Sequence, residues 1–380
     1  MKIYFLTGAT GVVGSAIAQR LLEEPDTRIK LLIRALSQTD LDARLDVLCV
    51  YWGLDAVSRR TRVEAIRGDT TVPYFGIAPE RYAALSTECT HIVHCAAMVR
   101  MNLPIEEARL SAVVGAYNIL DFARAARAAG TLEKVEFIST VGVGGRLPGV
   151  LPERWITEER TFHNTYEQAK AEAETVVAAA LEEGLPMTVH RLSMVIGHSC
   201  TGRIINFQIF YHLAEFLSGT RSYGLFPNPG KTTLDIVPVD YVAEVVVWSS
   251  RQPGTIGSVL HLCAGPERAL PLLNLRDRIG RKFRAAGFAV PPPVIIPAGI
   301  FRAAVPILRV IMPANIRRAL NALPIFLEYL AEDQSFGNQA SSELLNRAGI
   351  CYPATTDYVD RALDYYLAHG KRAKPASSKT

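Results

Sequence analysis

The sequence predicts an α/β protein in which a doubly wound parallel sheet is followed by a smaller, mostly helical C-terminal lobe. Short apolar segments alternate with helical patterns over the first two thirds of the chain, as in consecutive βαβ units. A glycine-rich turn follows the first apolar segment directly. With 380 residues, 49% of them hydrophobic, the chain can bury one large core and carry an appendage. This composition excludes a disordered, collagen-like or coiled-coil protein.

Seven segments are predicted to be buried strands because they are short, rich in apolar residues and separated by polar, glycine-rich or helical stretches. They are residues 2–7, 29–33, 63–66, 91–94, 135–139, 187–192 and 259–263. The main helical patterns cover residues 12–22, 41–50, 105–129 and 165–183. The third of these has Leu110, Val113, Val114, Tyr117 and Leu120 at helical spacing. The fourth ends before Gly184 and Pro186, which are typical of a helix C-terminus.

The alternation of strands and helices is interrupted at residues 203–233 and again after residue 266. We therefore expect a sheet domain over residues 1–265, with the 203–233 insertion contributing to the smaller lobe. That lobe is expected over residues 266–370. The last ten residues, 371–380, are expected to form a disordered basic tail.

Positive charge is concentrated near the C-terminus, although the formal net charge is only +4. The tail carries four basic residues and no acidic one, and residues 278–327 carry eight basic residues and no Asp or Glu. Such a run is explained by a solvated face, or by an apolar lid whose arginines keep it soluble. It is equally typical of a surface for a polyanion or for an anionic membrane. Both interpretations stay open.

Cysteine and histidine placement favours neither disulfides nor a metal site. The six cysteines form no C-x-x-C pair, and the N-terminus leads directly into a strand instead of a signal peptide, so we expect a cytoplasmic protein. The longest uncharged stretch, residues 285–301, contains four prolines and is too short for a membrane span. The alternative of peripheral membrane contact through residues 278–327 stays open, because such contact needs no membrane-spanning helix. His91 and His94 fall on opposite faces of one strand, so no metal is expected.

The glycine-rich turn has the spacing G-x-x-G-x-x-G, with Gly8, Gly11 and Gly14 between the first strand and the first helix. Glycines there allow a tight turn, close approach of backbone amides to a pyrophosphate, and packing of helix against strand. The alternative is a turn that is merely tight. Its position inside a βαβ unit favours a dinucleotide site and a Rossmann-type sheet.

Arg34, at the end of the second predicted strand, selects among dinucleotides. NAD-binding proteins place an Asp or Glu there for the ribose 2′-hydroxyl, whereas an Arg suits the 2′-phosphate of NADP. NADPH is therefore the expected cofactor, and the alternative is an ordinary surface arginine. Asp69, after the third strand, could meet the adenine. The small residues Ala96 and Ala97 follow the fourth strand and permit close approach to the ribose and pyrophosphate.

Tyr166 and Lys170 form a Y-x-x-x-K pair at the start of a predicted helix. A separation of four residues places phenol and ammonium on one helical face. The lysine charge is expected to lower the tyrosine pKa, which would make the phenol an acid or base nearer neutral pH. Ser139 and Thr140 end a strand shortly before this pair, and a hydroxyl there can bind a substrate oxygen beside the phenol.

The motifs TGATGVVG, HCAA, STVGVG and YEQAK, in this order, resemble the extended short-chain dehydrogenase/reductase superfamily. The segments LLIRALSQTDLDARL, AIRGDTTVPYFGI, HRLSMVIGHSCTGRI and LDIVPVDYVAEVV resemble its male sterility-type NAD(P)-binding branch, which contains fatty acyl-CoA reductases and thioester reductase domains. The similarity covers roughly residues 1–265. Many family members carry an Asn in the helix after the fourth strand, where this chain has Ala112.

The resemblance implies Thr140, Tyr166 and Lys170 as the catalytic residues, with Ser139 as a neighbour. It implies a cofactor site made of Gly8, Thr10, Gly11, Val12, Val13, Gly14, Arg34, Arg44, Asp69, Ala96, Ala97, Lys170, Leu192, Ser193 and Val195, and no metal.

The function implied is NADPH-dependent reduction of an acyl thioester, on coenzyme A or an acyl carrier protein, to an aldehyde or alcohol. Three alternatives share these residues or part of them. One is a superfamily member acting on a ketone, an alcohol or a nucleotide sugar. Another is an NADP-binding regulator without turnover, and the third is a membrane-bound interaction protein. No nucleic-acid partner is expected. The sequence leaves the acyl group, the donor, the product and the oligomeric state open.

Overall fold

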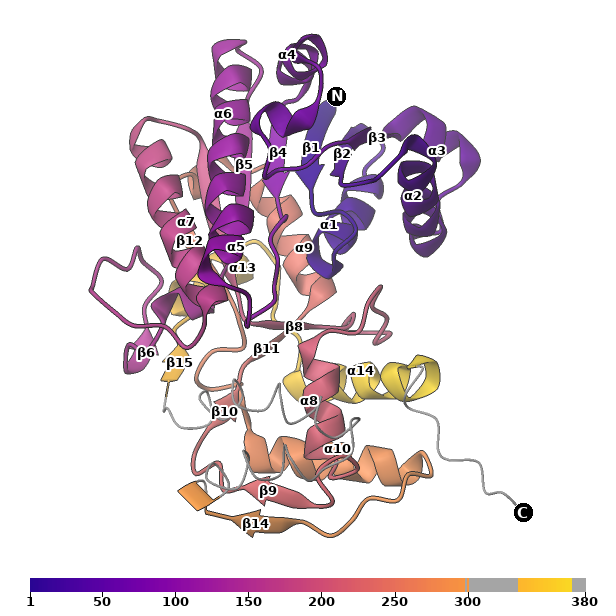
Figure 1. Cartoon of the computed structure of the whole chain (residues 1–380), viewed down its shortest axis with the longest axis vertical. Coiled ribbons are helices and arrows are strands. Elements are labelled where there is room, and N and C mark those ends of the chain that lie inside the picture. Colours follow the sequence, from indigo (N-terminus) through magenta and orange to yellow (C-terminus); the bar gives the residue numbers. More distant parts are fainter. Residues whose placement is uncertain (298, 301–333, 371–380) are drawn as a thin grey trace.

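A seven-stranded parallel sheet forms the centre of the upper part of the molecule (Figure 1). The computed structural model describes residues 1–297, 299–300 and 334–370. The strands of the sheet are β1 (Lys2–Thr7), β2 (Thr27–Ile33), β3 (Val63–Arg67), β4 (His91–His94), β5 (Lys134–Thr140), β7 (Met187–Leu192) and β12 (Val259–Leu262). Their order is β12-β7-β5-β4-β1-β2-β3, so the chain reverses direction across the sheet between β1 and β4. The predicted α/β fold with a parallel sheet is confirmed.

Helices cover both faces of this sheet and enclose two apolar cores (Figure 1). On one face lie α1 (Val12–Leu22), α2 (Gln38–Trp52) and α9 (Val239–Ser249). On the other lie α4 (Pro79–Glu88), α6 (Gly115–Ala128) and α7 (Thr165–Glu182). A short helix, α3 (Ala56–Arg62), precedes β3. Single turns of 3-10 helix lie at Val141–Gly144 and Pro253–Thr255, and Pro73–Gly76 forms a tight turn in which Tyr74 and Phe75 have positive φ.

The long helix predicted over residues 105–129 is present but not uniform. It begins as α5 (Ile105–Arg109), continues as a π-helical turn at Leu110–Val114, and ends as α6. The predicted apolar positions are confirmed at Leu120, which is fully buried, and at Val113, which packs on the core. They are wrong at Leu110 and Tyr117, which are 49% and 51% exposed. Small residues such as Ala108, Ala112 and Ala116 face the core instead, where they let the helix approach the sheet closely.

A separate apolar core lies inside the smaller lobe, which is drawn in the lower part of Figure 1. It is built mainly from α8 (Ile209–Leu217), α10 (Leu272–Ala285) and α14 (Thr355–His369). Four two-stranded pairs accompany these helices or connect them to the sheet. The pairs are β8 (Met194–Ile196) with β11 (Ile236–Pro238), β9 (Leu225–Pro227) with β14 (Val294–Ile296), β10 (Thr233–Leu234) with β13 (Leu270–Pro271), and β6 (Gly149–Leu151) with β15 (Gln334–Phe336).

The C-terminal third is not confined to the lower part. Helix α13 (Gln339–Arg347) packs against β12, and its Leu345 is fully buried in a core shared with α1 and α9. The predicted basic tail, and four of the eight basic residues of the acid-free segment, lie outside the described residues. In the described ranges no helix is long and apolar enough to cross a bilayer. In the same ranges no three His, Cys, Asp or Glu side chains are grouped so that they could hold a metal ion.

Candidate active site

The turn between β1 and α1 can be made only by glycines at two positions. Gly8 has a φ of +76°, and a Cβ on it would lie 2.8 Å from the backbone nitrogen of Ala96. A Cβ on Gly14 would lie 2.3 Å from the carbonyl oxygen of Gly8. The turn closes through a 2.9 Å hydrogen bond from the Gly11 amide to the Gly8 carbonyl. The first turn of α1 therefore opens at the point where β1 and β4 diverge, where a pyrophosphate can bind the free amides.

The rest of the predicted pyrophosphate segment divides between backbone and packing roles. Thr10 and Gly11 are exposed at the N-terminus of α1. Val12 is buried and joins the core of the lower lobe, while Val13 packs on the sheet core. A Cβ at Gly8 or Gly14 would thus collide with backbone atoms of the turn and of residues 95–96, so glycines are needed there for close packing of the turn.

Two predicted cofactor residues meet at the end of β2. Arg34 follows β2 directly, is 72% exposed, and has its Nη1 3.9 Å from Oδ2 of Asp69. Asp69 Oδ1 accepts hydrogen bonds of 2.9 Å from the amide and hydroxyl of Thr71. Arg44, on α2, donates from Nε to Asp40 at 3.0 Å. Both guanidinium groups are open to solvent, so a phosphate could reach either of them beside its acidic partner.

The remaining predicted cofactor residues lie at the carboxyl ends of β4 and β7. Ala96 and Ala97 follow β4, and the Ala96 amide donates to the Thr7 hydroxyl at 3.2 Å. The same hydroxyl is 2.9 Å from Nδ1 of His94. Burial, reinforced by the charge of Lys170, lowers the pKa of His94 to about 3. His94 is therefore a neutral structural partner of this edge.

Leu192 ends β7, Ser193 follows it, and Val195 lies in β8. Both Leu192 and Ser193 are buried. The sequence analysis missed Asp235, which lies beside them. Its carboxylate accepts the amides of Ala264 at 2.7 Å and Gly265 at 2.9 Å and interacts with the Ser193 hydroxyl. Burial raises the pKa of Asp235 to about 6.

Thr140, Tyr166 and Lys170 meet at the carboxyl end of β5. Thr140 is the last residue of β5, and its side chain is hydrogen-bonded to the Tyr166 phenol. Asn164 caps α7 by accepting the Glu167 amide at 3.0 Å, which places Tyr166 in the first turn. Lys170, one turn later, is buried and donates from Nζ to the Ile138 carbonyl at 2.7 Å. Its ammonium also lies 4.7 Å from the centre of the Phe137 ring.

The predicted lowering of the Tyr166 pKa is wrong for this structure. Burial, together with the charge of Glu167, raises the pKa of Tyr166 to about 12, against a smaller opposite effect of the Thr140 hydrogen bond. Burial also lowers the pKa of Lys170 to about 8, although the negative charge of Glu174 opposes this change. Tyr166 is consequently a protonated hydroxyl at neutral pH and can donate a proton.

A buried charge network behind the predicted catalytic side chains was also missed by the sequence analysis. Arg191, 1% exposed, pairs with Glu174 at 2.7 Å on the helix that carries Lys170. The Ser139 hydroxyl is 2.5 Å from the same carboxylate, and His261 lies 3.3 Å from Nη1 of Arg191. The only signal in the sequence was an acid four residues after Lys170, at the spacing of one helical face.

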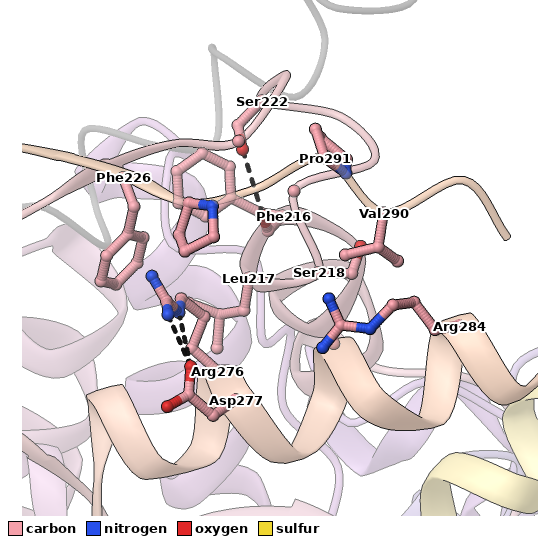
Figure 2. A pocket seen from close by; sticks show the side chains of 14 residues that line it. Phe216, Leu217, Ser218, Ser222, Phe226, Arg276, Asp277, Arg284, Val290 and Pro291 are labelled. Carbon is pink, nitrogen blue, oxygen red and sulfur yellow. Dashed lines mark hydrogen bonds and ion pairs between the residues drawn. The ribbon is translucent and has the colours of Figure 1, made fainter.

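A separate cavity of about 250 Å³ lies in the lower lobe, between α8, α10 and the loops that flank β9 and β14 (Figure 2). Phe216 and Phe226 form part of its apolar wall, and Arg276 and Arg284 contribute guanidinium groups. Arg276 is bound by Asp277, with 2.5 Å between Nη2 and Oδ1. None of the predicted catalytic or cofactor residues lines this cavity.

The sequence of this chain is similar to a known protein family and to several curated proteins. Residues 6–246 match the family model described as male sterility protein, an NAD-binding domain. The aldehyde reductase lnaA of Aspergillus flavus is 30% identical over 278 residues, which are 70% of this chain and 26% of that protein. The L-2-aminoadipate reductase large subunit of Penicillium chrysogenum is 29% identical over 69% of this chain and 19% of its own length. The chain thus spans about a quarter or less of these curated relatives.

The solved structures extend the similarity to nearly the whole chain. The terminal R domain from the myxalamid PKS-NRPS biosynthetic pathway superposes with a TM-score of 0.80 at 25% identity, covering 99% of this chain and 93% of that one. The reductase domain of a nonribosomal peptide synthetase from Mycobacterium tuberculosis has the same fold, with a TM-score of 0.74 at 20% identity over 97% and 92% of the two chains. The chain therefore belongs to the male sterility-type branch of the extended short-chain dehydrogenases/reductases, a family of NAD(P)-dependent oxidoreductases.

Proposed function

We propose that the protein is an NADPH-dependent reductase of acyl thioesters. The observation that carries the proposal is the pair of hydrogen-bonded hydroxyls, Thr140 and Tyr166, placed with buried Lys170 at the carboxyl edge of the sheet. This pair can bind and protonate a carbonyl oxygen, and the glycine turn of α1 opens at the same edge. The names of the relatives, which include an aldehyde reductase and reductase domains of peptide synthetases, support the reaction class.

The proposed cofactor site uses the predicted residues. Gly8, Thr10, Gly11, Val12, Val13 and Gly14 would hold the pyrophosphate through backbone amides and close packing. Arg34 and Arg44 would bind the 2′-phosphate, with Asp69 near the adenine and Ala96 and Ala97 along the ribose. Lys170, Leu192, Ser193 and Val195 would lie at the nicotinamide end. The support is the position of the tight glycine turn, which joins the carboxyl end of β1 to the N-terminus of α1, where helix amides can bind a phosphate.

When bound, the nicotinamide supplies the hydride for the thioester carbonyl. Thr140 and Tyr166 would stabilise the oxyanion that develops on the carbonyl oxygen, and Tyr166 would donate the proton that gives a hemithioacetal. The carbon–sulfur bond then breaks, which releases the thiol and an aldehyde. Lys170 would keep a positive charge beneath this site.

We further propose that the acyl donor is polyanionic, either coenzyme A or the phosphopantetheine arm of a carrier protein. Arg276 and Arg284 at the lower-lobe cavity are cationic groups that suit such a donor. One structural neighbour is a thiolation-reductase di-domain from an archaeal peptide synthetase. In this proposal residues 1–265 hold the cofactor, and residues 266–370 with the 203–233 insertion bind the acyl donor.

Product analysis tests the proposed function. The purified protein is incubated with NADPH and, separately, acyl-CoA thioesters of short and long chain, acyl carrier protein thioesters, ketones and nucleotide sugars. NADPH oxidation with release of aldehyde or alcohol from a thioester is the expected result. Turnover of ketones or nucleotide sugars, with none of any thioester, would contradict the proposal. It would favour the alternative of a superfamily member that acts on a ketone, an alcohol or a nucleotide sugar. NADP binding without turnover of any substrate would favour a regulator.

Replacing Arg34 with Ala should weaken the binding of NADPH and leave the binding of NADH nearly unchanged. Loss of a charge-assisted hydrogen bond of about 1.5–3 kcal/mol corresponds to a rise of roughly ten- to hundredfold in the KM for NADPH. The KM for NADH should change little, because that cofactor has no 2′-phosphate. Arg28→Ala, at an exposed position on β2, the strand that Arg34 follows, is the matched control. Equal KM changes for both cofactors would contradict the assignment of Arg34.

The kcat/KM of the reduction should fall as the pH rises through about 8. The pKa of Lys170 is lowered to about 8, so the charged form is present below that pH and is lost above it. Because kcat/KM reports groups of the free enzyme, its alkaline limb should have this midpoint. In Lys170→Arg the guanidinium stays charged, so the limb should move to higher pH even if the rate is lower. An unchanged midpoint in that variant would assign the limb to another group.

A further inference from the structure

A connection of 25 residues, 141–165, separates the two hydroxyls of the proposed site. It contains only one 3-10 turn and the three-residue strand β6. Loops of this length inside a compact fold need external contacts to hold one conformation. The position of Thr140 relative to Tyr166 therefore depends on what holds this connection.

The first contact is with residues 334–337. Strand β15 pairs in parallel with β6 along three register positions, from Gly149 opposite Gln334 to Leu151 opposite Phe336. Gln334 reaches further, and its side-chain amide donates to the carbonyls of Gly145 at 2.8 Å and Leu147 at 2.6 Å.

The carbonyls of Gly145 and Leu147 follow the 3-10 turn Val141–Gly144, which begins directly after Thr140. Within that turn the Gly142 amide donates to the Thr140 hydroxyl at 3.2 Å, and the Gly145 amide donates to the Gly142 carbonyl at 3.0 Å. A displacement at Gly145 is therefore transmitted through two hydrogen bonds to the Thr140 hydroxyl.

The second contact is made by Glu153, which follows β6. Its carboxylate accepts the amides of Ala340 at 2.7 Å and Ser341 at 2.9 Å and the hydroxyl of Ser341. An acid in this place satisfies otherwise unpaired amides at the start of α13. The Ser341 hydroxyl in turn accepts the amide of His261 on β12 at 3.0 Å. Glu153 thus ties the connection to the central sheet.

The third contact joins the same segment to the helix of Tyr166 and Lys170. His261 Nδ1 is 2.7 Å from the Gly337 carbonyl, and its other ring nitrogen faces Arg191. Arg191 donates to the Arg154 carbonyl at 2.9 Å and pairs with Glu174 on α7. Residues 334–341 therefore contact the connection directly between Gly145 and Glu153. They reach Glu174, on the helix of Tyr166 and Lys170, through the side chains of His261 and Arg191.

We propose that residues 334–341 form a clamp that positions Thr140 and Tyr166 for proton donation, with Gln334 and Glu153 as its positioning residues. The inference rests on the proposed role of those two hydroxyls. Neither Gln334 nor Glu153 belongs to the proposed catalytic or cofactor set. The clamp acts by restricting the connection, since small misplacements of reacting groups cost large factors in rate.

The test compares Gln334→Leu and Glu153→Gln with Asp55→Asn. Asp55 caps α3 with the same three kinds of hydrogen bond, from two amides and a serine hydroxyl, but it lies outside the connection and the clamp. Steady-state kinetics gives kcat and the KM for NADPH, and hydrogen–deuterium exchange with mass spectrometry reports on residues 141–165.

Both clamp variants should lower kcat by about tenfold or more while the KM for NADPH stays within about twofold of the wild type. Exchange should accelerate across residues 141–165. The Asp55→Asn enzyme should match the wild type in kcat and in that exchange. Two variants at independent contacts guard against one that folds poorly.

Wild-type kcat in both clamp variants, or unchanged exchange in residues 141–165, would overturn the clamp. If the wild type reduces no thioester, the proposed function fails but the exchange measurement still decides the clamp. Kinetics with whichever carbonyl substrate is turned over then replaces the thioester assay.

Discussion

Replacing Tyr166 with Phe is expected to reduce kcat by a factor of about 10²–10⁴, the usual contribution of a positioned general acid. The variant removes one hydroxyl and leaves the ring, so packing around the first turn of α7 is retained. In the wild type that hydroxyl is hydrogen-bonded to Thr140, and burial raises its pKa to about 12. It is therefore protonated throughout the neutral range and available as a donor. The KM for NADPH should change by less than about threefold, since the proposed acid acts on substrate.

Steady-state NADPH oxidation measures this effect, and Tyr117→Phe is the control. Tyr117 is half-exposed on α6 and belongs to no predicted site, so its loss should leave kcat unchanged. A Tyr166→Phe enzyme with more than a tenth of wild-type kcat would remove Tyr166 as the proton donor. If its biological activity were also intact, the NADP-binding regulator would become the better interpretation.

Replacing Arg191 with Met should lower the free energy of unfolding by about 3–5 kcal/mol, because it leaves a buried carboxylate without its partner. Arg191 is 1% and Glu174 6% exposed, and the two are joined at 2.7 Å. The guanidinium also satisfies the Arg154 carbonyl at 2.9 Å, so its removal breaks more than one contact. The double variant Arg191→Met, Glu174→Leu should lose less than the sum of the single losses, since neither charge is then left alone.

Urea unfolding at constant pH measures these free energies, with an unchanged m-value as the check on two-state behaviour. The exposed pair of Arg124 and Glu183, at 2.8 Å with side chains 39% and 52% exposed, is the matched control. Arg124→Met should cost no more than about 1 kcal/mol, as is usual for a solvated pair. Equal losses at the buried and exposed pairs would contradict the role assigned to burial.

The sequence was sufficient for features that depend on neighbouring residues. Each of the seven predicted strands is present within two residues at either end, because a short apolar segment between polar turns has few other stable conformations. The glycine turn and the Tyr166–Lys170 pair were found for the same reason. Helix α9 was missed, because eight of its eleven residues are buried and only Asp240 and Glu244, four positions apart, mark an exposed face.

Features that join distant segments could not be predicted in this way. Glu153 and Ser341 are 188 positions apart, and nothing in either local pattern indicates the other. The direction of the Tyr166 pKa was also misjudged, since spacing shows that Lys170 is near but not that both groups are buried. Burial and the negative charge of Glu167 set the direction of the shift, and the charge of Lys170 is not among its causes.

The π-helical turn at Leu110–Val114 shifts which residues of α6 lie on the same face as the residues of α5. A π-turn takes up one extra residue without an extra turn, so residues before and after it follow helical wheels offset by about 100°. Ser111, which accepts the Met98 amide at 2.9 Å, supports the loop after β4 from within this turn. Ala112, which stands where the family resemblance leads us to expect an Asn, lies inside this turn, so its correspondence to that Asn can shift by one position. A side chain one number away can then occupy the equivalent place in space.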